Sequence, residues 1–322
     1  MDKEDYFRVE NQLVTVVNNT FPIARKVKAN PPIVKLTREI EEVIRKLYDP
    51  KIKFRNGTIE VIEEDIEQNK QNEILLTNYE IVKLKGFLTV AEYACNELND
   101  SNPSTNSYDG IDEDLDFDWL MRFFDSVGLI NNQDLQKLWG KILAGEVRSP
   151  GLCSLRTLDI IRNLSRDEAK SFDKLSKYVM QSGNIFFIFD NGFSSPNIDE
   201  DEYNVKSFNL IKSQKLSFVL DIVPLIESGL FTIDQYFASN FSESNSIEIH
   251  NDKLLYTLEA QEKGSTIKFE PYILTKSGIE LFRVIHKSKS FITDTEYANC
   301  CIEELQKKYT DIKFSIMPFT DN

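Results

Sequence analysis

The clearest pattern of hydrophobic and polar positions lies between residues 133 and 164. Apolar side chains recur there three and four positions apart, which puts them on one face of an α-helix: Leu135, Leu138, Trp139, Ile142 and Leu143. Ser149-Pro150-Gly151 comes next, and it ends the predicted helix because proline has no N–H to continue the hydrogen-bond ladder. Ser154 can cap a second helix that extends to Leu164. The pattern therefore predicts two packed helices joined by a short turn.

Further segments space their apolar residues in the same way, at 33–47, 77–98, 115–127 and 165–179. Two of them begin with the S/T-x-x-E pattern of a capping box, Thr77 to Glu80 and Ser165 to Glu168. Gly86 is expected to weaken the helix over 77–98, because glycine lowers helix stability. Residues 51–76 fit either a continued helix or a short strand.

The pattern changes from Asn184 onward, where a continuous β-prone run covers 185–189. Helices are predicted within 208–230, where Pro224 interrupts the pattern, and at 275–285 and 295–308. Short strands are predicted between turn signals at 247–249, 254–258, 267–269 and 312–316. This order of helix, hairpin strands and helix is compatible with a winged-helix-like unit, and many other small folds share it.

Two loop-rich stretches indicate domain boundaries, at 99–110 and 190–202. We predict a helical N-terminal region over 1–105, a central helical domain over 106–182 and a C-terminal α+β domain over 183–322. The predicted fold class is therefore α+β, with a mainly helical N-terminal and central region and a smaller, winged-helix-like C-terminal region.

The central helices contain the residues that we expect in the structural core: Trp119, Phe123, Leu138, Trp139, Ile142 and Leu143. Glu146, Arg148 and Arg156 flank the Pro-Gly turn, and a loop between rigid helices can present binding groups. Their alternative role is structural, because arginine can donate to carbonyls that lack partners at a helix end. We expect Arg156 to order the turn through a polar contact, and Arg148 to contribute little if it is exposed.

Composition and charge limit the class of protein. Hydrophobic residues make up 41% of the 322 residues and charged residues 28%, as in a folded globular protein. The formal charge of −14 opposes binding to nucleic acid and to anionic membrane surfaces. The start lacks the pattern of a secretory signal, and no run approaches the roughly 18 apolar residues of a membrane span. We therefore expect a cytoplasmic protein without a membrane segment.

Candidate chemistry is sparse. The chain has two histidines, His250 and His286, and it lacks the G-x-S-x-G, G-x-x-x-x-G-K-[ST], G-x-G-x-x-G and H-E-x-x-H patterns. Its four cysteines form no C-x-x-C pair and are expected to be free thiols. The acidic run at 109–118 fails as a calcium loop, because Phe117 and Phe123 stand where an EF-hand needs Gly and Glu. We therefore expect no catalytic residues, no cofactor and no metal site.

The segment over 112–180 resembles an uncharacterised bacterial family classed as a domain of unknown function. The resemblance rests on several short elements in order: Asp118-Trp119-Leu120, Phe123-Phe124, Gln-x-Leu-Trp-x-x-Ile-Leu-Ala-Gly-Glu from Gln136 to Glu146, Pro150-Gly151 and Ser154 to Leu158. A shorter version of the Leu-Trp signal resembles one in proteins grouped under abortive phage infection. The resemblance implies a bacterial or phage origin and no particular reaction.

Three functional hypotheses follow. The first is a non-enzymatic protein that binds a protein partner, in phage defence or its regulation as the looser resemblance implies, with a homo-oligomer left open. The second is nucleic-acid binding through the C-terminal region, which is weakened because 216–287 contains ten Asp or Glu against six Lys or Arg. The third is a carboxylate-dependent hydrolase or nuclease, which requires several Asp or Glu to converge in one cleft.

Overall fold

The computed structural model describes residues 31–48, 52–55, 58–61, 78–99, 115–190, 211, 213–232, 237–241, 246–261, 264–287 and 291–320. The chain divides into two compact units, Met1–Arg162 and Asn163–Asn322. The predicted boundary near residue 105 lies outside the described residues, and the one between 182 and 183 falls at the turn of a β-hairpin. In the described residues, no helix is both long and apolar enough to cross a membrane.

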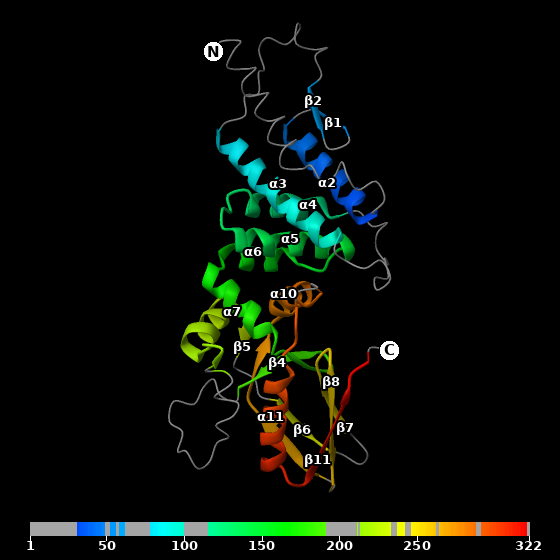
Figure 1. Cartoon of the computed structure of the whole chain (residues 1–322), viewed down its shortest axis with the longest axis vertical. Coiled ribbons are helices and arrows are strands. Elements are labelled where there is room, and N and C mark those ends of the chain that lie inside the picture. Colours follow the sequence, from blue (N-terminus) through cyan, green and yellow to red (C-terminus); the bar gives the residue numbers. More distant parts are fainter. Residues whose placement is uncertain are drawn as a thin grey trace. The chain divides into compact units, whose positions relative to one another are not determined.

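The first unit is built from helices (Figure 1), namely α2 (Pro31–Tyr48), α3 (Asn78–Asn99), α4 (Phe117–Val127), α5 (Gln133–Arg148) and α6 (Leu155–Asn163). A small antiparallel hairpin joins β1 (Ile52–Arg55) to β2 (Thr58–Val61), in the segment that fitted either helix or strand. Asp116 caps α4 by accepting from the Trp119 N–H at 3.1 Å, as an aspartate before the first turn of a helix commonly does. The calcium-loop positions before residue 115 lie outside the described residues.

Close backbone contacts explain the glycines of this unit. A Cβ atom on Gly86 would lie 2.3 Å from the carbonyl oxygen of Gly128, and one on Gly140 would lie 2.5 Å from Cβ of Tyr93. Such separations are too short for any side chain, so glycine allows α3 to lie directly against the α4–α5 turn and against α5. Helix α3 continues unbroken through Gly86, so the expected cost of this glycine to helix stability stays a prediction.

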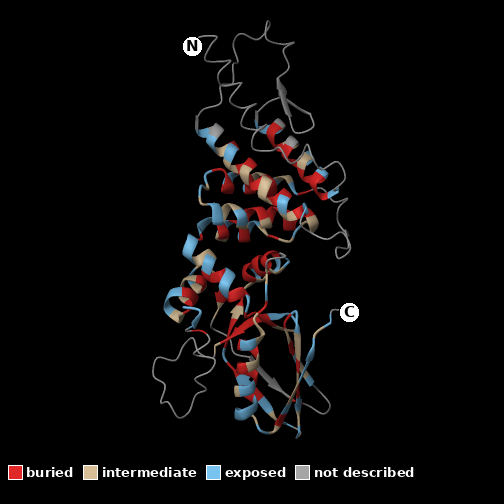
Figure 2. Cartoon of the chain, viewed as in Figure 1, coloured by how far each residue is buried: buried red, intermediate tan, exposed pale blue. Residues whose placement is uncertain are grey.

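The core of the first unit is aromatic. Trp119 stacks on Phe123 with ring centroids 5.1 Å apart, and Phe123 meets Trp139 edge to face at 5.4 Å. Figure 2 shows the buried residues on the inner faces of α3, α4 and α5. Of the residues predicted in the core, Leu138 is half-buried, because it lies at the flank of the buried stripe of α5, and the rest are buried: Trp119, Phe123, Trp139, Ile142 and Leu143.

The second unit combines helices with an antiparallel sheet, so the α+β class with a helical N-terminal and central region is confirmed. Its helices are α7 (Arg166–Ser176), the π-helical turn η3 (Phe218–Ile222), α9 (Val223–Glu227), α10 (Lys276–His286) and α11 (Thr295–Lys308). The capping box predicted at Ser165 and Glu168 is confirmed at the start of α7. The predicted interruption at Pro224 agrees with the structure, because η3 ends at Ile222 and Pro224 lies in the first turn of α9, where its missing N–H is tolerated.

Seven strands form the main sheet in the order β11-β8-β7-β3-β4-β10-β5. In chain order they are β3 (Met180–Ser182), β4 (Ile185–Phe189), β5 (Phe231–Thr232), β7 (Ser246–His250), β8 (Leu254–Ala260), β10 (Pro271–Leu274) and β11 (Ile312–Pro318). A second pair joins β6 (Phe237–Asn240) to β9 (Thr266–Phe269). The single pairing of Gln181 in β3 with His250 in β7 links the two halves of the main sheet, and this link lies beside the candidate site.

Candidate functional site

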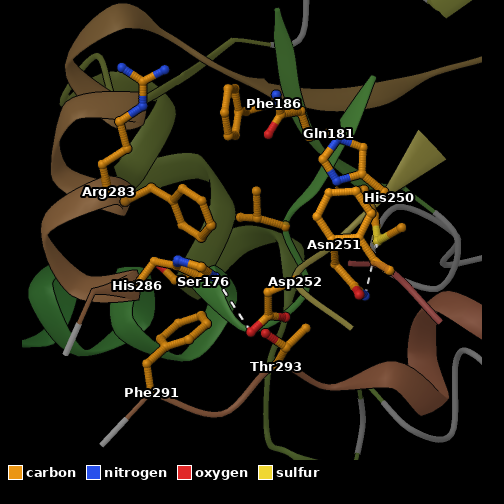
Figure 3. A pocket seen from close by; sticks show the side chains of 14 residues that line it. Ser176, Gln181, Phe186, His250, Asn251, Asp252, Arg283, His286, Phe291 and Thr293 are labelled. Carbon is orange, nitrogen blue, oxygen red and sulfur yellow. Dashed lines mark hydrogen bonds and ion pairs between the residues drawn. The ribbon is translucent and has the colours of Figure 1, made fainter. Parts of the chain in front are cut away.

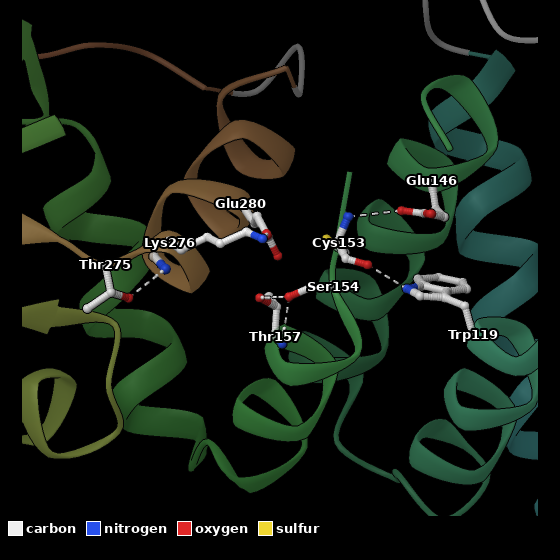
Figure 4. Close-up of polar contacts among 9 residues, drawn as sticks. Trp119, Glu146, Cys153, Ser154, Thr157, Thr275, Lys276 and Glu280 are labelled. Carbon is white, nitrogen blue, oxygen red and sulfur yellow. Dashed lines mark hydrogen bonds and ion pairs between the residues drawn. The ribbon is translucent and has the colours of Figure 1, made fainter. Parts of the chain in front are cut away.

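The turn between α5 and α6 is held by Glu146 (Figure 4). The Glu146 carboxylate is buried and accepts hydrogen bonds from the N–H of Gly151 at 2.6 Å and of Cys153 at 3.0 Å. The Cys153 carbonyl in turn accepts from the Trp119 indole N–H at 2.7 Å. Because its carboxylate binds the protein's own backbone, Glu146 has a structural role at this turn.

Arg156 does not order the turn through a polar contact as expected, and Arg148 does not meet the condition of exposure under which it was expected to contribute little. Arg148 is half-buried and donates to the carbonyl oxygen of Glu97 in α3 at 2.7 Å, whereas Arg156 is exposed. The reason is helical geometry. Arg148 ends α5 on the side that faces α3, and Arg156 lies on the outer side of the first turn of α6.

A pocket of about 250 Å³ lies in the second unit (Figure 3). Side chains from several segments line it, including the ends of α7 and α10, the β3–β4 hairpin and the β7–β8 turn. The lining residues are Ser176, Val179, Met180, Gln181, Phe186, His250, Asn251, Asp252, Phe282, Arg283, His286, Phe291, Thr293 and Phe319. Both histidines of the chain, 36 positions apart in sequence, therefore reach one pocket.

The β7–β8 turn presents its side chains in a defined geometry. The side-chain oxygen of Asn251 accepts from the N–H groups of Lys253 at 2.9 Å and Leu254 at 2.8 Å, a local contact that stabilises tight turns. The amide of Asn251 also contacts the Met180 sulfur at 3.6 Å. The N–H of Phe319 donates to the Lys253 carbonyl at 2.8 Å. These contacts place Asp252 and Phe319 at the pocket.

Helix α10 supplies the opposite wall. The Thr275 hydroxyl accepts from the Gly278 N–H at 3.2 Å and caps the helix. A Cβ atom on Gly278 would lie 2.2 Å from the Leu230 carbonyl oxygen, so glycine lets this helix pack closely against the β5 end of the unit. Phe282 and His286 then lie one helical turn apart on the same face. They both line the pocket.

Aromatic rings border the pocket on two sides. On the α10 side, Phe282 lies 5.8 Å from Phe186 and 5.2 Å from His286, and Phe291 lies 5.0 Å from His286 between ring centroids. We name these four residues the α10 ring cluster. On the other side, His250 stacks on Phe319 at 4.3 Å with an interplanar angle of 14°. Figure 3 shows His286 and Phe291 across the pocket from His250.

Few charged groups lie at the pocket. The His286 Nε2 atom is 3.5 Å from the Asp252 carboxylate, and both side chains are about one-third exposed, at 34% and 33%. The Arg283 guanidinium lies over the Phe186 ring, 5.6 Å from its centroid. The Lys253 ammonium donates to the Thr293 carbonyl oxygen at 3.2 Å. Of the described residues that line the pocket, Asp252 is the one that carries a carboxylate.

Asp252, His286 and Ser176 are the residue types of a serine hydrolase, and all three line the pocket. Ser176, however, is 2% exposed, and its hydroxyl donates to the Phe172 carbonyl within α7 at 2.7 Å. A nucleophile must instead give its proton to the base and reach the substrate. Ser176 is therefore bonded within its own helix and is not placed to act as a nucleophile. Among the described residues, no group of His, Cys, Asp and Glu could hold a metal ion.

The four cysteine thiols are free, as the spacing predicted, and the structure buries all of them. Burial raises the pKa of Cys95 to about 12, with a smaller contribution from the negative charge of Glu92. Burial also raises the pKa of Cys301 well above its usual range. Protonated, buried thiols are poor nucleophiles and poor metal ligands, so these residues contribute to packing.

The pocket was not predicted from the sequence. His250 ends β7 and His286 ends α10, as their surrounding patterns indicated, but neither position carries a motif. The sequence offered one weak signal, namely that it contains only two histidines, which the fold could bring together although neither lies in a motif. Asp252, Phe282 and Phe319 gave no separate signal, because aspartate at a turn and phenylalanine at helical spacing are ordinary structural choices.

No curated protein and no solved structure matches the chain. The sequence profile of one family matches residues 90–300, which include the α5–α6 turn and every pocket residue except Phe319. The matched region is well over half of the chain and extends further in both directions than the resemblance over 112–180. The chain therefore belongs to the family described as "Protein of unknown function (DUF2806)".

Proposed function

We propose that the chain is a non-enzymatic binding protein, and that the pocket of the second unit receives one side chain of a protein partner. The volume of the pocket carries this proposal. At about 250 Å³ it is smaller than the roughly 300–1,000 Å³ of pockets for drug-sized ligands. A pocket of this size suits a single anchoring side chain, and such anchors dominate the energy of many protein interfaces.

The polar groups of the pocket support binding rather than catalysis. Ser176 is buried and donates to its own helix, which removes the nucleophile from an Asp252–His286 pair. A hydrolase with two carboxylates would need a second acidic side chain, but among the described residues that line the pocket Asp252 is the only acidic one. What the pocket offers instead is a mixed lining of phenylalanine rings and polar side chains, and such polar groups can fix the orientation of a bound side chain.

The biological setting that we propose is the bacterial cytoplasm, with a role in phage defence or its regulation. Its support is the looser resemblance of the Leu138-Trp139 segment to proteins grouped under abortive phage infection. The winged-helix-like character of the C-terminal region, and the nucleic-acid role attached to it, stay predictions. The excess of acidic residues over 216–287 and the formal charge of −14 oppose that role.

A pair of matched substitutions tests partner binding at the pocket. Gln181→Trp adds a large side chain at a lining position, while Gln261→Trp adds the same side chain at an exposed position of the same unit that does not line the pocket. Each chain is immobilised and exposed to a bacterial lysate, and every captured protein is then purified and titrated against the three chains by calorimetry.

We expect a captured partner to bind the Gln181→Trp chain at least about tenfold more weakly than the unchanged chain, because the added ring occupies the space of the anchor. Gln261→Trp should bind like the unchanged chain. Partners that bind all three chains equally would show that the pocket does not receive an anchoring side chain. Circular dichroism of the three chains shows whether the fold is retained.

A further inference from the structure

We propose that the side chain received by the pocket is a tyrosine or a tryptophan, with its ring between His250 and the α10 ring cluster and its O–H or N–H donating to Asp252. This inference rests on the proposed function and names the chemistry of the partner's anchor. It concerns the pocket residues of the second unit alone.

The arrangement of rings favours a planar guest. The α10 ring cluster lies on one side, with tilted ring pairs at 5.0–5.8 Å, and the parallel His250–Phe319 stack lies on the other. Aromatic pairs prefer offset or edge-to-face contacts at centroid separations of about 4.5–7 Å. A ring that enters between the two sides can make both kinds of contact at once. An aliphatic side chain would gain only the burial of its surface.

The charges at the pocket disfavour an ionic guest. Charged groups of both signs lie at the pocket, so an ion of either sign would meet a like charge as well as an opposite one: Asp252 on one hand, Arg283 and Lys253 on the other. Burying an ion next to a like charge is costly because the charge loses water and gains repulsion. A neutral ring avoids both penalties.

Asp252 distinguishes a ring that carries a donor from one that does not. One oxygen of its carboxylate contacts His286, and the side chain is one-third exposed, so the carboxylate still reaches solvent. A carboxylate accepts hydrogen bonds from several donors at once. A phenol O–H or an indole N–H can therefore replace water at Asp252, and the carboxylate still has a hydrogen-bond donor. Tyrosine and tryptophan bring such a donor on a large ring, and they are enriched among interface anchors.

The two histidines provide a direct measurement of occupancy in the full-length chain. Because the chain contains no other histidine, its proton NMR spectrum has two sets of imidazole C–H signals, and His250→Gln and His286→Gln assign them. The probes are p-cresol and 3-methylindole for the two proposed side chains, toluene for a ring without a donor, methylguanidinium for a cation and 4-methylbenzoate for an anion. Each probe is titrated at neutral pH.

We expect p-cresol and 3-methylindole to shift both imidazole signals and to bind at least about fivefold more tightly than toluene, the difference that one charge-assisted hydrogen bond can supply. Asp252→Asn should reduce that preference to about twofold or less. Asp173→Asn, the same change at an exposed position of α7 that does not line the pocket, should leave it unchanged.

The outcomes separate this inference from the function on which it rests. Toluene binding as tightly as p-cresol, or either ion binding more tightly than both neutral rings, overturns the tyrosine or tryptophan assignment and leaves the pocket as a binding site for another side chain. Imidazole signals that respond to no probe overturn the proposed function together with the inference. The comparison among probes uses the unchanged chain, so the result does not depend on whether Asp252→Asn folds.

Discussion

The Glu146 carboxylate accepts a hydrogen bond from the backbone N–H of Cys153 at 3.0 Å, across the turn that joins α5 to α6. A second bond, from the Gly151 N–H at 2.6 Å, occupies the other carboxylate oxygen. The turn thus obtains acceptors for two backbone donors from a side chain that is 2% exposed.

Glu146→Gln should lower the free energy of unfolding of the first unit by about 2 kcal/mol, because the new amide group turns a donor towards one of the two backbone N–H groups. Trp119 and Trp139 are the only tryptophans and both lie in the first unit, so urea unfolding followed by tryptophan fluorescence reports this unit. Asp159→Asn, at an exposed carboxylate 3.8 Å from Arg122, is the control and should change stability by less than about 0.5 kcal/mol. Equal effects of the two changes would contradict the structural role of Glu146.

Arg148→Ala should destabilise the first unit by about 1 kcal/mol, because it removes the hydrogen bond to the Glu97 carbonyl at 2.7 Å and leaves that acceptor without this donor. Arg156→Ala, at an exposed position of α6, should stay within about 0.5 kcal/mol of the unchanged chain. The same fluorescence measurement compares them. A larger loss for Arg156→Ala would restore the role that the sequence indicated.

Gly86→Ala should destabilise the first unit by at least about 2 kcal/mol, even though alanine is the better helix former by about 1 kcal/mol. The added Cβ would lie 2.3 Å from the Gly128 carbonyl oxygen, so α3 must move away from the α4–α5 turn. Asn96→Ala, at an exposed position of the same helix, should be neutral or slightly stabilising. A stabilising effect of Gly86→Ala would show that the two backbones do not meet this closely.

Alkaline pH should destabilise the first unit through Cys95. Burial raises the pKa of this thiol from its ordinary value of 9.0 to about 12, so the folded state keeps its proton at a pH where the unfolded chain loses it. The stabilisation is complete below pH 9.0 and is lost as the pH rises towards 12. Between pH 8 and pH 10 the unchanged chain should lose about 1 kcal/mol more than Cys95→Ala. Parallel losses in the two chains would show that another group causes the change.

The sequence by itself determined the elements whose causes are local. The apolar stripe over 135–143, the Pro-Gly turn and the Ser165 capping box predicted α5, the break after it and the start of α7. Strands β7, β8, β9 and β11 appeared where β-prone residues alternate between turn signals, within a few residues of the predicted limits. These signals suffice because helix periodicity, capping and turn geometry depend on neighbours a few positions apart.

Only the tertiary structure decided how residues distant in sequence meet. Whether Gly86 weakens α3 or allows it to pack depends on Gly128, which lies 42 positions away. Which arginine contacts another helix depends on the position of the Glu97 carbonyl in α3. The pocket requires the β7–β8 turn, α10 and the residue after β11 to converge, because the sheet order brings these segments together. Packing between segments distant in sequence sets these contacts. The spacing of apolar residues within one segment does not predict which surfaces will pack against each other.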